Sequence, residues 1–242
     1  LDKLTKLFKK VVVIINSGAT IDCEYFAENE NVQSILFGWQ GGMEGGLAIA
    51  DLLCGDVNPS GKMVDTIAKS YDCYPCKEDF WECFDHVDYT DDIYVGYRYF
   101  ETIPGAGENV RYPFGFGLSY TDFEYSDFKV TDKNEDSITV SLKLRNTGAM
   151  KAKEISQIYA SYKDSRTYTP HFQLCGVKTT ELEAGEEATI TMTIDSYWIK
   201  AVLEDGSRVN PDGEIILYAG GHQPDNVSNQ LTGNVCQKIK LQ

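Results

Sequence analysis

Residues 37–63 decide the fold and read FGWQGGMEGGLAIADLLCGDVNPSGKM. They continue a β-rich run at 32–39, cross a glycine pair and enter an apolar pattern with helical spacing. Gly41 and Gly42 allow a sharp turn because they have no Cβ atom. Gly55 is placed to end the helix in the left-handed conformation. The stretch therefore predicts a strand, a glycine turn, a helix, a tight turn at 58–61 and a returning strand, which together form a βαβ unit.

The residues before this stretch predict a further strand–helix pair. Residues 11–16 read VVVIIN, which is typical of a strand in a parallel sheet covered on both faces. The end of a helix is expected within 1–10 and a short helix within 22–28. Two successive strand–helix units indicate an open parallel α/β sheet, and such sheets bind ligands at the carboxyl ends of their strands. These ends are predicted at Asn16-Ser17-Gly18 and Trp39-Gln40-Gly41-Gly42.

The second half of the chain follows a different pattern. Residues 66–92 form a polar, aromatic and cysteine-rich segment, residues 94–100 alternate weakly, and residues 113–117 read as an extended connector. Beyond them, short alternating runs without a helical period are separated by turn residues, which predicts an antiparallel β-sandwich. The expected strands are 137–145, 155–162, 172–182, 188–194 and 214–219.

The composition disfavours several classes of function. The chain has 22 basic and 37 acidic residues and a net charge of −15, which argues against binding nucleic acid or an anionic membrane surface. No run of about 18 apolar residues predicts a membrane span. A neutral sugar is compatible with this charge. The 15 tyrosines either offer platforms for stacking sugars or simply pack the sandwich strands.

The seven cysteines are an odd number, so they cannot all pair within the chain. This slightly favours a reducing compartment such as the cytoplasm. The chain starts with Leu1, so the lack of a signal peptide carries no weight. Three interpretations remain open for the cysteine-rich segment: a structural zinc site, a disulfide between Cys73 and Cys76, or free thiols. The candidate zinc ligands are Cys73, Cys76, Cys83 and His86.

The run at 41–63 resembles the second, α/β sandwich domain of glycoside hydrolase family 3, the family of β-glucosidases and β-xylosidases. Two more segments of the resemblance follow in the same order, IYVGYRYFET at 93–102 and YPFGFGLSYTDFEYSDFKV at 112–130. Residues after about 120 resemble the fibronectin type III-like domain that closes many members. The resemblance implies a partial α/β sandwich with an open parallel sheet and linker at 1–119. An all-β fibronectin III-like sandwich follows at 120–242.

The resemblance also implies an activity: retaining hydrolysis of terminal β-D-glucosides or related β-glycosides, without a cofactor. Retention requires two carboxyl groups about 5–5.5 Å apart. In the family the nucleophile is an aspartate of a TIM-barrel domain, and the acid/base glutamate lies in a loop ahead of the region that corresponds to 1–16. Neither can be assigned to a residue of this chain. We therefore expect the chain alone to be inactive, to form one wall of an active site and to brace a barrel on the same or a companion chain.

Two alternatives to this interpretation stay open. The chain is either a piece of a larger enzyme or part of a permuted member in which these domains precede the barrel. A non-catalytic carbohydrate-binding or scaffolding module is the competing function. Both functions predict affinity for sugars, but only the enzyme predicts a partner barrel.

Trp39 and Glu44 are the candidate substrate-binding residues. Trp39 either stacks on a sugar face or fills the core. Glu44 either lines the sugar site or caps the helix that follows it, where its charge complements the helix dipole by about 0.3–1 kcal/mol. Arg98, between Tyr97 and Tyr99, is expected to anchor a domain interface through an ion pair. The sequence yields no catalytic residue and no assigned metal ligand.

Overall fold

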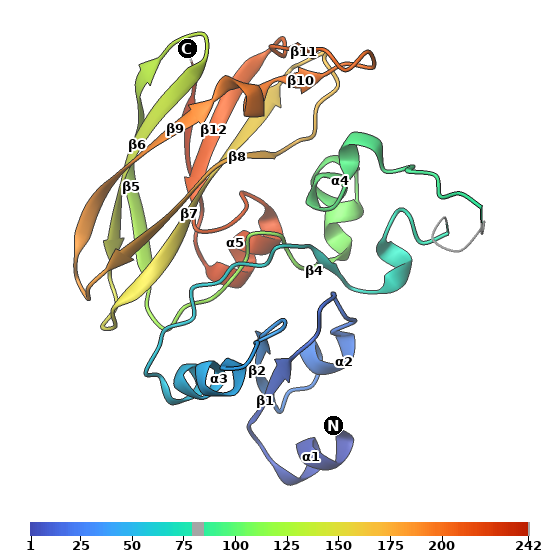
Figure 1. Cartoon of the computed structure of the whole chain (residues 1–242), viewed down its shortest axis with the longest axis vertical. Helices are drawn as coiled ribbons and strands as arrows, with labels where there is room; N and C mark the ends of the chain where they lie inside the picture. The colour runs from blue at the N-terminus through green and yellow to red at the C-terminus, as the bar shows by residue number, and fades with distance from the viewer. Residues whose placement is uncertain (79–84, 242) are drawn as a thin grey trace.

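The computed structural model describes residues 1–78 and 85–241 (Figure 1). A β-sandwich forms the upper part of the molecule in this view, and a smaller α/β part lies below it. The segment between them carries short helices and a two-stranded sheet. No helix in the described ranges is long and apolar enough to cross a membrane.

The α/β part is built on one parallel strand pair. Its elements in chain order are α1 (Asp2–Leu7), β1 (Val11–Ile15), α2 (Glu24–Ala27), β2 (Val32–Phe37) and α3 (Gly45–Cys54). β1 and β2 pair in parallel, with α2 in the connection between them, since parallel neighbours need a crossover connection. Gly55 ends α3 with φ +81°, which is the left-handed cap predicted from the sequence. The open α/β arrangement is thus confirmed.

Two details of the sequence prediction are wrong here. The returning strand after α3 does not join the parallel sheet, because β3 (Ile67–Ala68) pairs antiparallel with β4 (Val110–Tyr112). Residues 58–61 do not form the predicted turn. The Asn58 side chain instead binds residues at the start of the second half of the chain. Its amide donates to Ser119 Oγ at 2.8 Å, and the Tyr120 amide donates to Asn58 Oδ1 at 2.8 Å. The parallel βαβ unit is therefore β1–α2–β2.

The burial of β1 also differs from the prediction. Its residues alternate between partly covered and exposed, and Val12 and Ile14 are 47% and 37% exposed. The side covered by the described chain packs in a small cluster with Ile15, Cys23 and Met63. One face of this apolar strand is therefore only partly covered by the described residues.

The segment between the two parts carries several short helical elements among turns and loops. It contains the 3₁₀ turns η1 (Tyr71–Cys73), η2 (Asp92–Tyr94) and η3 (Ala106–Asn109), with α4 at Tyr97–Thr102. The weak alternation at 94–100 therefore does not form a strand. Gly96 precedes α4 with φ +64°, a conformation that glycine adopts without strain, so it redirects the chain into the helix.

The second half is an antiparallel sandwich of two sheets. One sheet has the order β5 (Phe123–Lys133), β6 (Ser137–Asn146), β9 (Glu187–Asp195). The other has the order β13 (Gln237–Lys240), β12 (Glu214–Gly220), β7 (Ala152–Lys163), β8 (Gln173–Leu182). Inward-facing residues of both sheets, including Val140, Leu142, Ile158 and Leu217, form one continuous buried core. All five predicted strands are present.

Beyond the five predicted strands the sandwich contains β5, β13 and α5 (Asn226–Thr232), which the sequence prediction missed along with the short elements at 196–209. β5 breaks its pairing register with β6 in two places, which hides the alternation expected of a strand. α5 is short and mostly polar, and it begins where the Asp225 carboxylate accepts the Ser228 amide hydrogen at 2.8 Å. The 3₁₀ turn η4 (Ser196–Ile199) leads into a small hairpin of β10 (Ala201–Val202) and β11 (Arg208–Val209).

Buried polar contacts join the connector at 113–117 to the sandwich. The Gln157 side-chain amide donates to the carbonyl oxygens of Gly115 and Gly221, at 2.9 and 3.1 Å. A Cβ atom at position 115 would lie 2.3 Å from Gln157 Oε1, and the backbone there has φ +77°. Only glycine fits both conditions, so this residue lets the connector lie directly on β7.

An ion pair with little exposure crosses the same junction. Lys62 Nζ lies 3.3 Å from Glu154 Oε2, and the two side chains are 12% and 6% exposed. The Tyr125 hydroxyl donates to the other carboxylate oxygen at 2.9 Å. Burial beside this carboxylate raises the pKa of Tyr125 well above its usual value. The carboxylate therefore has partners from both halves of the molecule, as a buried charge requires.

Candidate functional site

The candidate site is a cavity at the carboxyl ends of β1 and β2. It has a volume of about 340 Å³ and lies against the N-terminal end of α3. It is lined by Asn16, Gly38, Gln40, Gly41, Gly42, Gly45, Gly46 and Ile49. Parallel strands present their carboxyl ends at one edge of a sheet, so residues after β1 and after β2 meet here. Both strand ends singled out from the sequence contribute to the cavity.

Glycines shape this cavity through close approach of the backbone. A Cβ atom on Gly41 would lie 2.8 Å from the Cα atom of Gly45, at the start of α3. Gly42 has φ +66°, which only a residue without a Cβ adopts freely. The glycine turn therefore folds tightly back on the helix and leaves open space where side chains would otherwise project.

Two amide side chains supply the hydrogen-bonding groups of the cavity. Asn16 and Gln40 are exposed, and within the described ranges neither side chain has a hydrogen-bond partner. The Gln40 side chain lies against Gly18, where a Cβ atom would come within 2.7 Å of Gln40 Nε2. An amide offers both donors and an acceptor, which suits the hydroxyl groups of a neutral sugar. Sequence reasoning placed these residues at strand ends but did not single out their side chains.

Trp39 adjoins the cavity in sequence without being one of its lining residues. It is half-buried and has φ +48°, an uncommon backbone conformation for a bulky residue. Such conformations cost about 1–3 kcal/mol and cluster at functional sites. This geometry is compatible both with stacking on a sugar and with filling the core, so the role of Trp39 in substrate binding stays a prediction.

Glu44 occupies the N-cap position of α3 and is exposed. Its side chain makes no capping hydrogen bond, although its carbonyl accepts the Ala48 amide hydrogen at 3.0 Å. The expected cap position is correct, but the side chain interacts with the helix at most through the dipole. Glu44 does not line the cavity, and its proposed part in sugar binding stays a prediction.

The cavity can bind but has no group to break a glycosidic bond. None of its lining residues carries a carboxyl group, whereas retaining hydrolysis needs two of them about 5–5.5 Å apart. Backbone amides of α3, free at the helix start, and the two side-chain amides are its polar groups. The arrangement therefore suits positioning of a neutral polar ligand against chemistry supplied from elsewhere.

The cysteine-rich segment gives no metal site in the described part of the chain. No three His, Cys, Asp or Glu side chains gather there as a metal ion would require. Cys73 and Cys76 are not joined, so the disulfide between them is not formed, and Cys73 contacts Ser70 Oγ at 3.4 Å. Cys83, one of the four proposed zinc ligands, lies outside the described residues.

Arg98 does not make the ion pair expected of it. Among residues 1–78 and 85–241 it has no carboxylate partner, and its Nε atom is buried without an acceptor. Its guanidinium lies 5.8 Å from the centre of the Tyr97 ring. Tyr97 instead supplies the contact with the sandwich, since its hydroxyl accepts the Leu174 amide hydrogen at 2.9 Å.

Glu101, in the last turn of α4, is a carboxyl group with a strongly raised pKa in the region between the two parts. Burial raises its pKa to about 8, and the negative charge of Asp225 acts in the same direction. A hydrogen bond with Gln223 opposes this rise. The group faces the sandwich rather than the cavity, so it bears on how α4 is held and not on sugar chemistry.

Family models match most of the chain. The glycosyl hydrolase family 3 C-terminal domain matches residues 1–120, and the fibronectin type III-like domain matches residues 154–223. The chain belongs to glycoside hydrolase family 3. Its fold and order of domains agree with what the resemblance implied, whereas the boundary between 119 and 120 stays a prediction.

Individual family 3 members agree with this assignment. Beta-glucosidase A of Butyrivibrio fibrisolvens is 44% identical over 202 residues, which cover 77% of this chain and 24% of the relative. An exo-alpha-(1->6)-L-arabinopyranosidase of Bifidobacterium breve is 33% identical, over 82% of this chain and 26% of the relative. The crystal structure of a Paenibacillus barengoltzii beta-glucosidase matches with a TM-score of 0.85 and 30% identity, over 98% of this chain and 26% of that one. The chain thus spans about a quarter of the length of these proteins.

Proposed function

We propose that this chain forms one wall of the sugar site of a retaining β-glycosidase, whose catalytic carboxylates lie outside its 242 residues. The proposal rests on one observation: the cavity at the strand ends has free amides and an open glycine backbone but no carboxyl group. Terminal β-D-glucosides, or related β-glycosides, are the substrate class proposed for the whole enzyme. Relatives with different names leave the exact sugar to experiment.

The cavity residues would act by holding the sugar in place. Asn16 and Gln40 would exchange hydrogen bonds with sugar hydroxyls, and Trp39 would contact a sugar face. Glu44, at the start of α3, would lie close enough to take part in this binding. Fixing the ring in this way places its anomeric carbon before the nucleophile, which lowers the entropic part of the barrier.

The apolar surface of the α/β part supports a second role, the bracing of a barrel domain. Val12 and Ile14 on β1 are partly exposed, and Leu47 on α3 is 65% exposed. Parallel sheets are ordinarily covered on both faces, so these side chains need a partner. A TIM-barrel domain, on the same or a companion chain, is the proposed cover.

A chimeric enzyme tests the proposal. This chain replaces the matching segment of the Butyrivibrio fibrisolvens enzyme, and hydrolysis of a chromogenic β-glucoside is followed for the chimera and for the chain alone. We expect turnover from the chimera and none from the chain alone. Turnover by the chain alone would place a carboxylate pair within it. A folded but inactive chimera would favour the non-catalytic binding or scaffolding module.

Variants of the active chimera test the wall itself. Gln40→Ala is expected to raise KM about tenfold, because it removes hydrogen bonds to the bound sugar. Gln33→Ala is the matched control, since Gln33 is exposed on β2 and bonds only the carbonyl oxygen of Glu30. Equal kinetics for the two variants would contradict the assignment of the cavity as a sugar wall.

A further inference from the structure

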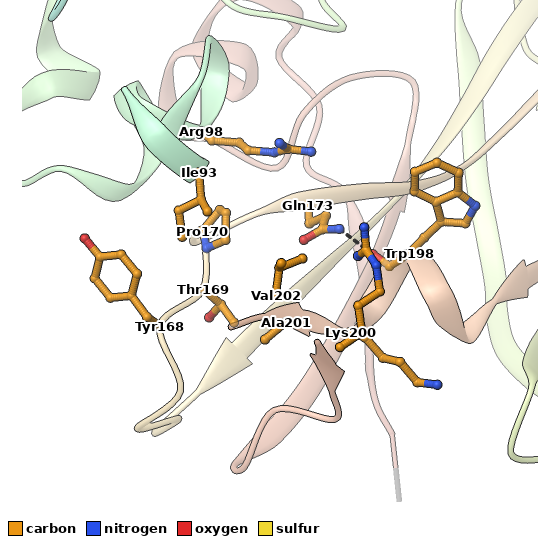
Figure 2. Close-up of a pocket in the computed structure, with 11 residues that line it drawn as sticks. Ile93, Arg98, Tyr168, Thr169, Pro170, Gln173, Trp198, Lys200, Ala201 and Val202 are labelled. Carbon is orange, nitrogen blue, oxygen red and sulfur yellow. Dashed lines mark hydrogen bonds between the residues drawn. The ribbon is translucent and has the colours of Figure 1, made fainter. Parts of the chain in front are cut away.

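A second cavity, of about 150 Å³, lies between the α4 region and the edge of the sandwich (Figure 2). In the close-up Arg98 extends over it from α4, Lys200 lies below it, and Tyr168 and Trp198 stand at opposite sides. The sandwich contributes the start of β8, the end of η4 and the hairpin β10–β11. Its lining residues are Ile93, Arg98, Tyr168, Thr169, Pro170, Gln173, Trp198, Lys200, Ala201, Val202 and Arg208.

The charge of this cavity is opposite to that of the molecule. Arg98, Lys200 and Arg208 line it, and no acidic residue does, although the whole chain carries −15. Within the ranges that the structure describes, none of the three cations forms an ion pair. Other cations of the sandwich do have acidic partners, such as Arg166 with Asp212 at 2.9 Å. Three unpaired cations around one hollow favour an anion there.

The Nε atom of Arg98 is a separate indication of a missing partner. It is buried and has no hydrogen-bond acceptor among the described residues. Buried guanidinium nitrogens normally find an acceptor, because leaving one unpaired costs about 1–3 kcal/mol or more. The terminal amino groups of the same guanidinium, rather than the covered Nε, would take a carboxylate from the cavity, since its two oxygens match the fork of N–H donors.

Aromatic and amide groups of the cavity point to a ring on the same ligand. Trp198 is 53% exposed and presents a surface on which a sugar ring can stack. Gln173 donates its amide hydrogen to the Trp198 carbonyl, which leaves the side-chain oxygen of Gln173 to accept from a hydroxyl group. The Arg208 guanidinium stacks 3.8 Å above the Tyr197 ring, which holds this cation in place.

The size of the cavity limits the ligand to a single ring. A volume of about 150 Å³ encloses one benzene-sized ring, so a bulkier sugar ring would fill this cavity and project in part into solvent. We propose that this cavity binds a sugar ring carrying a carboxylate, a hexuronate unit, with the carboxylate toward Arg98 and the ring beside Trp198. A single negative charge also meets less repulsion from an acidic chain than a phosphate dianion does.

Binding to the whole chain tests this proposal, with the methyl glycoside of glucuronate as the probe. Calorimetry or ligand-observed NMR should give a dissociation constant at least five times lower for this probe than for methyl glucoside, acetate or glucose 6-phosphate. Arg98→Gln and Lys200→Gln should each weaken binding of glucuronate at least fivefold. Lys200→Gln, more remote from the buried contacts, keeps the test valid if Arg98→Gln disturbs folding. Arg145→Gln, on the exposed side of β6, should leave binding unchanged.

Three results would overturn the proposal. If methyl glucoside binds as well as the glucuronide, the carboxylate is not recognised. If acetate or glucose 6-phosphate binds as well as the glucuronide, the cavity selects charge without regard to a carboxylated ring. Unchanged melting temperatures in the binding buffer show that the variants are folded, and retained binding in both folded variants would also exclude this site.

Discussion

Strands β1 and β6 show how the same kind of sequence has two different outcomes in one molecule. β1 reads VVVII and β6 reads SITVSLKLRN, so β1 is the more apolar of the two. Yet Val140, Leu142 and Leu144 of β6 are completely or almost completely buried, whereas Val12 and Ile14 of β1 are partly exposed. β6 faces a second sheet, whereas β1 pairs within the described residues with one strand, β2, and has helices on part of its surface. An apolar sequence therefore predicts that a strand needs burial. The elements packed against that strand decide whether the burial is complete.

The largest effect is expected from truncating Leu144 in the core next to β9, measured against the same kind of truncation at Ile14 of β1. Leu144→Ala should lower the free energy of unfolding by about 3 kcal/mol, since it empties a fully buried site. Ile14→Ala should cost less than about 1 kcal/mol, because the side chain is already partly in water. Urea denaturation followed by circular dichroism measures both. Equal losses would show that the two strands are equally well packed.

The junction between the two parts should give the next largest effect. Lys62→Met removes the cationic partner of the buried Glu154 carboxylate and should lower the free energy of unfolding by about 2 to 3 kcal/mol. Lys143→Met breaks two exposed ion pairs, with Asp127 and Glu187, and serves as the matched control, with no measurable change in the urea midpoint expected. If the urea midpoint moves alike for the two variants, the ion pair at the junction has no special part in joining the halves.

A smaller, pH-dependent effect is expected at Glu101, between α4 and the sandwich. Its pKa in the folded chain is about 8, above the ordinary value of 4.5. Between these pH values the unfolded chain loses the proton that the folded chain keeps, so stability falls as pH rises, by about 1 kcal/mol per unit. Glu101→Gln should remove this fall and become more stable than the parent near pH 8.

Urea denaturation at pH 5, 6.5 and 8 measures this difference between parent and variant. Glu124→Gln, an exposed substitution on β5, controls for the loss of one negative charge. The contrary result is that the free energies of unfolding of Glu101→Gln and the parent differ by the same amount at all three pH values. That result would mean that Glu101 is ionised in the folded chain like an ordinary glutamate.

Much of the fold could be predicted because its signals are local. The alternation of β6 and β9 and the left-handed Gly55 each leave a pattern within a few residues. The path of residues 58–61 could not be predicted in this way, because Asn58 binds Ser119, 61 positions later. The exposure of one face of β1 could not be predicted either. An apolar run indicates that a strand needs to be buried, but not which part of a protein buries it.

The candidate site was predicted in position more than in detail. Parallel strands placed Asn16 and Gln40 at one edge, and the cavity lies there. The prediction gave weight to Trp39 and Glu44, whose residue types suggest sugar binding, whereas the cavity is lined by their neighbours. The side-chain direction after a glycine turn depends on backbone angles such as φ +48° at Trp39, and composition does not reveal these angles.

Amide hydrogen exchange of the strands tests most directly the claim that the sandwich is complete while the α/β part needs a partner. In the chain alone, amides of β1 and β2 should exchange at least a hundredfold faster than those of β6 and β7, since little apolar surface holds them closed. In the chimera with a barrel, β1 and β2 should become protected while β6 and β7 stay as they were. Equal protection of all four strands in the chain alone would contradict the account.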